Sequence, residues 1–193
     1  MTLHVHETST GWIVAYTGQW VNGTLKPIPK ERWFTVDEAR ERFEQGKPLE
    51  VVEASDHDDD KLLGSRWVVG MTHPRWARAQ FLTPGRSIAA SISYELLDDG
   101  RLFLGQRADY VYPDLERLYT QTDAVTITSA YYKPDGTGAF AIRDVATRES
   151  MYTRFKDADF SALRFDWAEF GNWDTLANPE NGILPADFAM TPL

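Results

Sequence analysis

The chain has 193 residues, of which 42% are hydrophobic and 25% charged, a composition typical of a folded globular protein and not of a disordered or fibrous chain. Its formal net charge of −9 argues against non-specific binding to nucleic acid or to an anionic membrane, because both depend on clustered Lys and Arg. Cysteine is absent, which excludes disulfides, cysteine zinc sites, iron–sulfur clusters and thiol nucleophiles.

Short strands are predicted at the start of the chain. Residues 3–7 and 12–17 alternate or run apolar on either side of a turn, and Asn22 followed by Gly23 is the strongest short-range signal for a β-hairpin. Pro27 then ends the third strand, because proline has no amide hydrogen to donate to a neighbouring strand. Three strands are therefore expected before the first helix.

One α-helix is predicted, over residues 36–45. Thr35 is expected to be its N-cap, and Glu38, three residues later, completes a capping box. Gly46 and Pro48 are expected to end the helix, since glycine favours the left-handed conformation at a helix C-terminus and proline cannot continue a helix. The apolar positions share one narrow face, which we expect to lie across a sheet. These positions are Val36, Ala39 and Phe43.

A β pattern resumes after the helix and continues into the C-terminal part of the chain. Residues 49–54 form one predicted strand, and the alternation of residues 67–71 begins the next. Pro74 interrupts this second strand, which we expect to continue beyond a bend over residues 75–82. Short loops, which can reverse a strand but cannot make a parallel crossover, join the later strands. These later strands are 88–96, 101–106, 125–131, 139–143 and 148–155.

These segments predict an α+β protein with a mainly antiparallel β-sheet and one principal helix at about residues 36–45. The sheet is expected to be strongly curved or closed into a barrel, because an open sheet of about ten twisted strands tends to curl or split. No linker or internal repeat divides the sequence, so a single domain spanning residues 1–193 is expected.

Two groups of residues have the side chains of metal ligands but not the spacing of a metal site. His4 and His6 share one face of a strand, yet the sequence places no third ligand beside them. The alternating aspartates of residues 56–60 have the spacing that begins a calcium loop, but Lys61 occupies the position of the required glycine. We therefore expect neither a metal nor a cofactor.

His73 is the candidate for a general base, because it lies among basic and aromatic residues and its imidazole titrates near neutral pH. A carboxylate such as that of Glu95 would have to orient it across the sheet. The sequence contains no nucleophile elbow, phosphate-binding loop or dinucleotide fingerprint. The sequence therefore favours a role other than catalysis.

Tyrosines are concentrated in the predicted β region, where rings that project from a curved sheet can pack in the core or line a ligand cavity. If there is a cavity, Tyr94, Tyr131 and Arg107 are its candidate lining residues. The protein would then be a small-molecule carrier, or an enzyme with an aromatic-lined cavity.

Acidic residues are concentrated around the helix and the loop that follows the next strand. Residues 31–60 hold eleven acids against four bases, whereas residues 61–107 hold seven bases against three acids. A strongly acidic surface is suited to electrostatic recognition of a basic protein. The candidate partner-binding residues are Glu41, Glu44, Asp56, Asp58, Asp59 and Asp60.

The leading interpretation is a small acidic domain that binds a basic protein partner, as an inhibitor or immunity-type protein does when it neutralises its target. The alternative is the carrier or enzyme with a cavity.

The N-terminus lacks the pattern of a signal peptide, and no segment is long and apolar enough to span a membrane. We therefore expect a cytoplasmic protein that binds neither membrane nor nucleic acid. The sequence does not indicate the oligomeric state.

Overall fold

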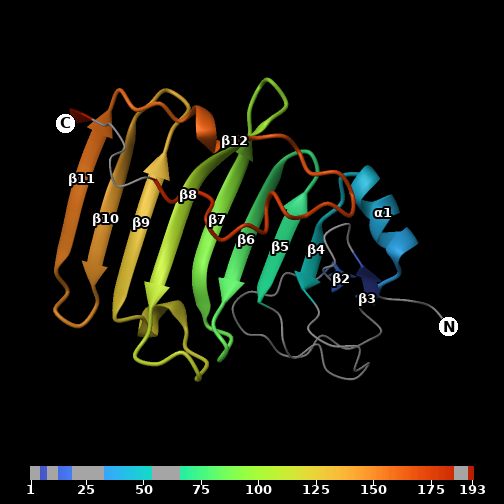
Figure 1. Ribbon diagram of the computed structural model, residues 1–193, viewed down its shortest axis with the longest axis horizontal. Helices are drawn as coiled ribbons and strands as arrows, with labels where there is room; N and C mark the ends of the chain where they lie inside the picture. The colour runs from blue at the N-terminus through green and yellow to red at the C-terminus, as the bar shows by residue number, and fades with distance from the viewer. Residues whose placement is uncertain (1–4, 8–12, 19–32, 54–65, 185–190) are drawn as a thin grey trace.

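The computed structural model describes residues 5–7, 13–18, 33–53, 66–184 and 191–193 (Figure 1). Within these ranges the chain forms one α-helix and thirteen strands of a single sheet. The elements are β1 (Val5–Glu7), β2 (Ile13–Thr17), β3 (Trp33–Phe34), α1 (Val36–Glu44), β4 (Leu49–Glu53), β5 (Trp67–Thr72), β6 (Trp76–Leu82), β7 (Ile88–Leu96), β8 (Leu102–Val111), η2 (Gln121–Asp123), β9 (Thr126–Tyr132), β10 (Gly138–Asp144), β11 (Ser150–Lys156), η3 (Ser161–Leu163), β12 (Arg164–Phe165) and β13 (Thr191–Pro192).

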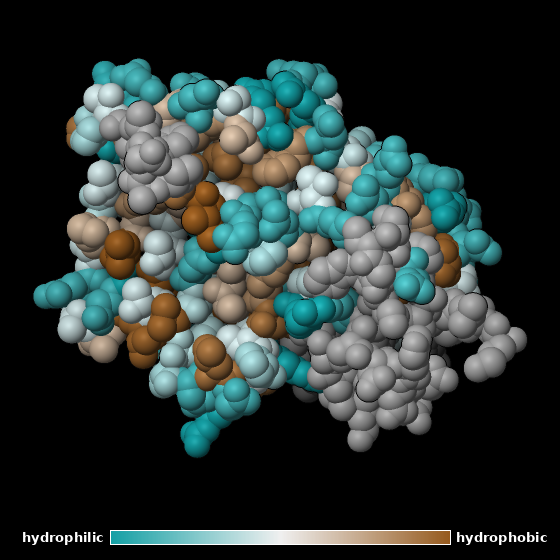
Figure 2. Space-filling view, in the orientation of Figure 1, coloured by the Kyte–Doolittle hydropathy of each residue, from teal (hydrophilic) through white to brown (hydrophobic). Residues whose placement is uncertain are grey.

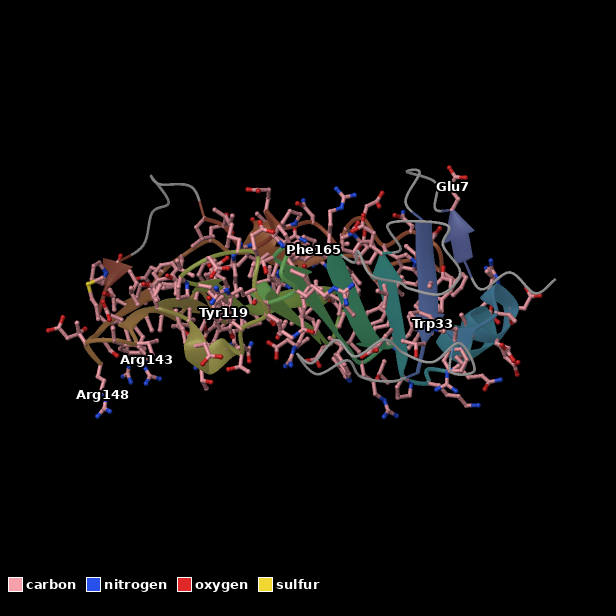
Figure 3. The ribbon with its side chains drawn as sticks, turned by 90° about the horizontal axis from the view of Figure 1, so that it is seen from below. Glu7, Trp33, Tyr119, Arg143, Arg148 and Phe165 are labelled. Carbon is pink, nitrogen blue, oxygen red and sulfur yellow. The ribbon has the colours of Figure 1, made fainter. Side chains whose placement is uncertain are left out.

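Every strand pair in these ranges is antiparallel, and the sheet is open. Its strands follow the order β1-β2-β4-β5-β6-β7-β8-β9-β10-β11-β13, with β3 paired to β2 and β12 paired to β8. Figure 3 shows the sheet nearly edge-on, as one twisted layer. This arrangement confirms the α+β class and the mainly antiparallel sheet with one principal helix. The sheet does not close into a barrel.

One local prediction is wrong. Residues 75–82 do not continue the preceding strand beyond a bend, because they form β6, which turns back and pairs antiparallel with β5. The Arg75 amide donates a hydrogen bond to the Thr72 carbonyl at 2.6 Å, and this tight turn reverses the chain. Pro74 lies within the turn, where proline favours a reversal as well as a bend. The hairpin predicted at Asn22 and Gly23 lies outside the described residues.

Helix α1 begins where the sequence predicts and ends one residue earlier. The capping box is confirmed: the Thr35 hydroxyl accepts a hydrogen bond from the Glu38 amide at 3.2 Å, and the Glu38 carboxylate accepts one from the Thr35 amide at 2.8 Å. At the other end Gly46 has a φ of 64°, and the Lys47 amide donates to the Arg42 carbonyl at 2.9 Å. This is a Schellman motif, so both ends of the helix are fixed by local hydrogen bonds.

Replacement of Thr35 by alanine is expected to lower the free energy of unfolding by about 1 kcal/mol, because the first turn of the helix loses its side-chain acceptor. Urea denaturation followed by circular dichroism measures this loss as a lower transition midpoint. The control is Thr35→Ser, which keeps the hydroxyl and should leave the midpoint close to that of the wild type. An unchanged midpoint in Thr35→Ala would show that the cap contributes nothing to stability.

The C-terminal part of the chain covers one face of the sheet. Residues 157–184, here called the strap, run from the end of β11 toward α1 and then back across the sheet (Figure 1). Buried strap residues belong to the main hydrophobic core and include Phe160, Leu163, Ala168, Trp173, Leu176 and Ala177. We call this side the covered face. The other side of β7–β11 is called the open face; residues 112–125, which include η2, lie on this side at one end of the strands (Figure 3).

Four aromatic rings join the strap to the N-terminal part of the chain. Phe170 and Trp173 of the strap pack against Tyr16 of β2 and Phe43 of α1, with ring centroids 5.3 to 6.3 Å apart. Trp173 is only 1% exposed. The core therefore connects the first strands of the sheet to the last part of the described chain.

The strap leaves one end of the covered face partly exposed. Figure 2 shows hydrophobic residues at the surface of this face toward the β9–β11 end of the sheet. Ile142 and Met151 are cross-strand partners in β10 and β11, and they are 40% and 61% exposed. The main core is therefore concentrated under the strap and α1, and β11 is the more exposed side of the sheet.

Candidate functional site

The outer surface of α1 carries the first group of candidate binding residues. Glu41 and Glu44, two of the candidate partner-binding residues, are exposed, and so is Asp37 in the first turn. We call these three side chains the acidic helix surface. Ala39 and Phe43, on the other side of the helix, are buried in the core. Burial of one side and exposure of the other fix the direction in which the carboxylates point.

The two arginines of α1 are held against aromatic rings. The Arg40 guanidinium lies 4.5 Å from the centre of the Phe170 ring, and that of Arg42 lies 4.6 Å from the centre of the Phe34 ring. Arg42 also donates a hydrogen bond to the Pro48 carbonyl at 3.0 Å. Cations in such positions are attracted to the ring faces. The arginines are therefore engaged with the protein itself. Glu38 is used in the capping box and Glu41 accepts a hydrogen bond from Gln45 at 2.7 Å, but the three carboxylates of the acidic helix surface are exposed to a partner.

The remaining candidate partner-binding residues lie outside the described part of the chain. They are Asp56, Asp58, Asp59 and Asp60, which follow β4 in the sequence. Whether they extend the acidic helix surface stays a prediction. His4 also lies outside the described residues, and the part of the chain that the structure does describe contains no group of three or more His, Asp or Glu side chains placed to hold a metal ion.

His73, the candidate general base, packs between two aromatic rings on the covered face. Its ring centre lies 4.4 Å from that of Phe43 and 4.8 Å from that of Trp167. Burial lowers the pKa of His73 below its ordinary value, because the neutral imidazole is favoured among these rings. Glu95 borders a groove on the open face instead, together with Tyr131. The structure thus places His73 in a packing position, apart from the carboxylate that the sequence paired with it.

Arg107, a candidate for lining a ligand cavity, binds the strap. Its guanidinium donates hydrogen bonds to the backbone carbonyls of Pro179 at 2.6 Å and Asn181 at 2.7 Å. It also forms two hydrogen bonds with the Asp109 carboxylate, at 2.6 and 2.9 Å. Arg107 is 7% exposed. A cation so deeply buried and so fully hydrogen-bonded holds the strap against the sheet.

Two tyrosine hydroxyls bind the same stretch of the strap. Tyr94 accepts a hydrogen bond from the Asn181 side-chain amide at 2.8 Å, and Tyr132 donates one to the Gly182 carbonyl at 2.8 Å. Burial raises the pKa of Tyr94 well above its ordinary value and that of Tyr132 to about 12. Together with Arg107 these residues form what we call the polar latch. The latch fastens the strap to the middle of the sheet.

Tyr131, the third candidate cavity residue, lies on the open face. It borders a shallow groove with a volume of about 650 Å³. Other residues that line this groove include Ser93, Glu95, Gln106, Lys133 and Asp135. Tyr94 also borders the groove, but its hydroxyl bonds to the strap on the covered face. The sheet therefore separates Tyr131 from the functional groups of Tyr94 and Arg107, and the three do not form one cavity.

The open face also carries residues that the sequence analysis did not single out. The cross-strand register runs from Gln106 in β8 to Tyr131 in β9, Ala139 in β10 and Arg154 in β11. Side chains at directly opposed positions of neighbouring strands point to the same face. The period-two pattern of each strand contains this information, but only the strand pairing shows which positions of different strands share a face.

The chain was compared with models of known protein families, with curated proteins and with solved structures, and none of these comparisons found a match. No helix within the described ranges has the length and apolar character needed to cross a membrane.

Proposed function

We propose that the protein is a binding domain that recognises a basic protein partner through the acidic helix surface, as an inhibitor does when it neutralises a basic target. The arrangement of charge on α1 carries this proposal. Its exposed carboxylates face outward, while both of its arginines lie against aromatic rings. The net charge of −9 adds a long-range field that attracts a positively charged protein.

The rigidity of α1 supports the same proposal. Hydrogen bonds fix both ends of the helix, and the Phe43 ring packs its last turn against Phe170 and Trp173. A charged surface that is already ordered loses little conformational freedom when a partner binds. Complementary charges on such a surface accelerate association and select the partner.

The cavity alternative has less support. Two of its three candidate residues, Tyr94 and Arg107, use their polar groups to hold the strap of the same chain. The third, Tyr131, borders the groove on the other side of the sheet. A carrier or enzyme would need these groups to converge on one ligand, so recognition through an outer surface is the better explanation.

The proposal is tested by capture from the native host with immobilised wild-type protein and with the variant Glu41→Lys/Glu44→Lys. Both positions are exposed and lie near the C-terminal end of α1, where lysine is compatible with the helix dipole, so stability should hardly change. We expect a basic protein to bind the wild type, and the amount captured by the variant to be lower by roughly tenfold or more.

The matched control is Glu116→Lys/Glu180→Lys, which changes the net charge equally at two exposed positions outside α1. It should retain most of the captured protein. A second variant, Asp58→Lys/Asp59→Lys, measures whether the acidic residues 56–60 contribute to the same interaction. Equal capture by the wild type and the α1 variant, or a captured partner with an acidic surface, would contradict recognition of a basic protein through α1.

A further inference from the structure

Three arginines on the open side of the sheet have no carboxylate partner among the described residues. Arg143 lies in β10, Arg154 in β11 and Arg148 in the turn between them, and all three are exposed. Figure 3 shows Arg143 and Arg148 projecting to the side opposite Phe165 of the strap. Several arginines elsewhere, such as Arg101, do form ion pairs. The three arginines therefore place positive charge without a carboxylate partner at the β10–β11 end of the sheet.

Exposed tyrosine rings stand beside these arginines. Tyr131 is 43% exposed and Tyr152 is 57% exposed, and the Arg154 guanidinium lies 5.6 Å from the centre of the Tyr152 ring. The cross-strand register places Ala139 between Tyr131 and Arg154, and Ala141 directly opposite Tyr152. Because the alanines are small, the rings and the guanidinium group stand above the surface of the sheet.

Six of the fourteen acidic residues in this half of the chain lie on the strap, and Asp144 and Glu149 lie beside Arg143 and Arg148 in the β10–β11 hairpin. Segment 108–193 contains fourteen acids and seven bases. The strap, which runs over the covered face, holds Asp157, Asp159, Asp166, Glu169, Asp174 and Glu180. The net charge of −9, from which the sequence predicts no binding to nucleic acid, is a sum over the whole chain. It therefore does not describe the charge of the open face by itself.

We propose that the open face over β9–β11 binds single-stranded nucleic acid. Guanidinium groups pair with phosphates, and flat tyrosine rings stack on unpaired bases, which is how proteins commonly hold single strands without sequence preference. A double helix keeps its bases stacked on one another, and an acidic peptide has no bases. Either ligand would therefore contact the arginines but would not stack on the tyrosine rings. The combination of exposed rings with arginines favours a single strand.

The affinity is expected to be modest. Three arginines give about three phosphate contacts, and each contributes about −0.7 to the slope of log K against log salt concentration, so the total slope should be about −2. The net charge of −9 opposes the approach of a polyanion. Glu95 and Asp135 in the neighbouring groove restrict phosphates to the arginine side. We therefore expect a dissociation constant of roughly 1–100 µM at low salt.

Fluorescence anisotropy of labelled twenty-nucleotide dT and rU strands, titrated with the full chain at several KCl concentrations, tests this proposal. We expect saturable binding with the shallow salt dependence given above. Arg143→Ala/Arg154→Ala should weaken binding at least tenfold and reduce the slope by about 1.4, because two phosphate contacts are lost. Tyr131→Ala/Tyr152→Ala should weaken binding roughly tenfold and leave the slope unchanged, because stacking releases no counterions.

The control variant Arg101→Ala/Arg164→Ala removes the same charge from arginines that pair with Asp99, and it should bind as the wild type does. Circular dichroism establishes that each variant is folded. Absence of binding at low salt, or unchanged affinity in the tyrosine variant, would overturn the proposal. The proposal would also be overturned if a poly-glutamate peptide competed for the surface as effectively as unlabelled nucleic acid does, because the surface would then be assigned to acidic peptides. The surface is distinct from α1, so none of these results bears on the proposed basic partner.

Discussion

Trp173→Ala is expected to lower the free energy of unfolding by about 3–5 kcal/mol, the cost of removing a large aromatic side chain from a well-packed core. Trp173 is 1% exposed, and its ring contacts those of Tyr16, Phe43 and Phe170. Its loss leaves a cavity where the strap, α1 and β2 meet. Urea denaturation with the linear extrapolation method measures the change.

The comparison for this substitution is Trp76→Ala in β6, because Trp76 is only partly buried. A smaller loss of stability is expected there, since fewer packing contacts disappear. If Trp173→Ala cost no more than Trp76→Ala, the strap would not belong to the cooperative core of the protein.

Arg107→Met should lower the free energy of unfolding by about 2–4 kcal/mol, because the carbonyls of Pro179 and Asn181 lose a charged donor in a buried position. The Asp109 carboxylate also loses its partner, although it is partly exposed and can be hydrated. Arg107→Lys should recover only part of the loss, since an ammonium group cannot reproduce the planar geometry that contacts three residues at once.

Hydrogen exchange provides a second readout for the latch. In Arg107→Met the backbone amides of residues 176–183 are expected to exchange faster than in the wild type, because this part of the strap is released first. The control is Arg101→Met, whose partner Asp99 is exposed on the surface, and it should leave both stability and exchange nearly unchanged. Unchanged exchange in the strap of Arg107→Met would contradict the role assigned to the latch.

The position of the helix, including its N-cap, could be predicted because the sequence signals that mark its ends are local. Thr35 and Glu38 are three residues apart, and Gly46 follows the last turn directly. The exposure of Glu41 and Glu44 follows from the same short-range periodicity, since the helical repeat places Ala39 and Phe43 on the other side. Local signals of this kind need no knowledge of the rest of the chain.

The strap could not be predicted, because its stability comes from contacts between residues far apart in the sequence. Residues 166–184 contain no helix or strand, so they present no periodicity to recognise. The hydrogen bond from Tyr132 to Gly182 spans 50 residues, and those from Arg107 span more than 70. Only the assembled sheet shows that these groups meet.

The tyrosines illustrate a second limit of sequence reasoning. Tyr94 and Tyr131 both lie in well-predicted strands, but their hydroxyl groups end on different sides of the sheet. The register between β7 and β8 shifts after Ser93, and this bulge changes which positions oppose one another. Assignment of a tyrosine to a face of the sheet therefore required the strand pairing. The sequence alone does not contain this pairing, so it could not show that the candidate cavity residues lie on different sides.

Recognition of a basic partner through α1 is tested most directly by the association rate constant of the captured partner, measured with purified proteins at several ionic strengths. The rate for the wild type should fall steeply as salt is added, because salt screens the attraction between the two proteins. Glu41→Lys/Glu44→Lys should associate roughly tenfold more slowly at low salt, with a flatter salt dependence, and the two rates should converge at high salt. Identical rates and identical salt dependence for the two proteins would contradict the proposed role of the acidic helix surface.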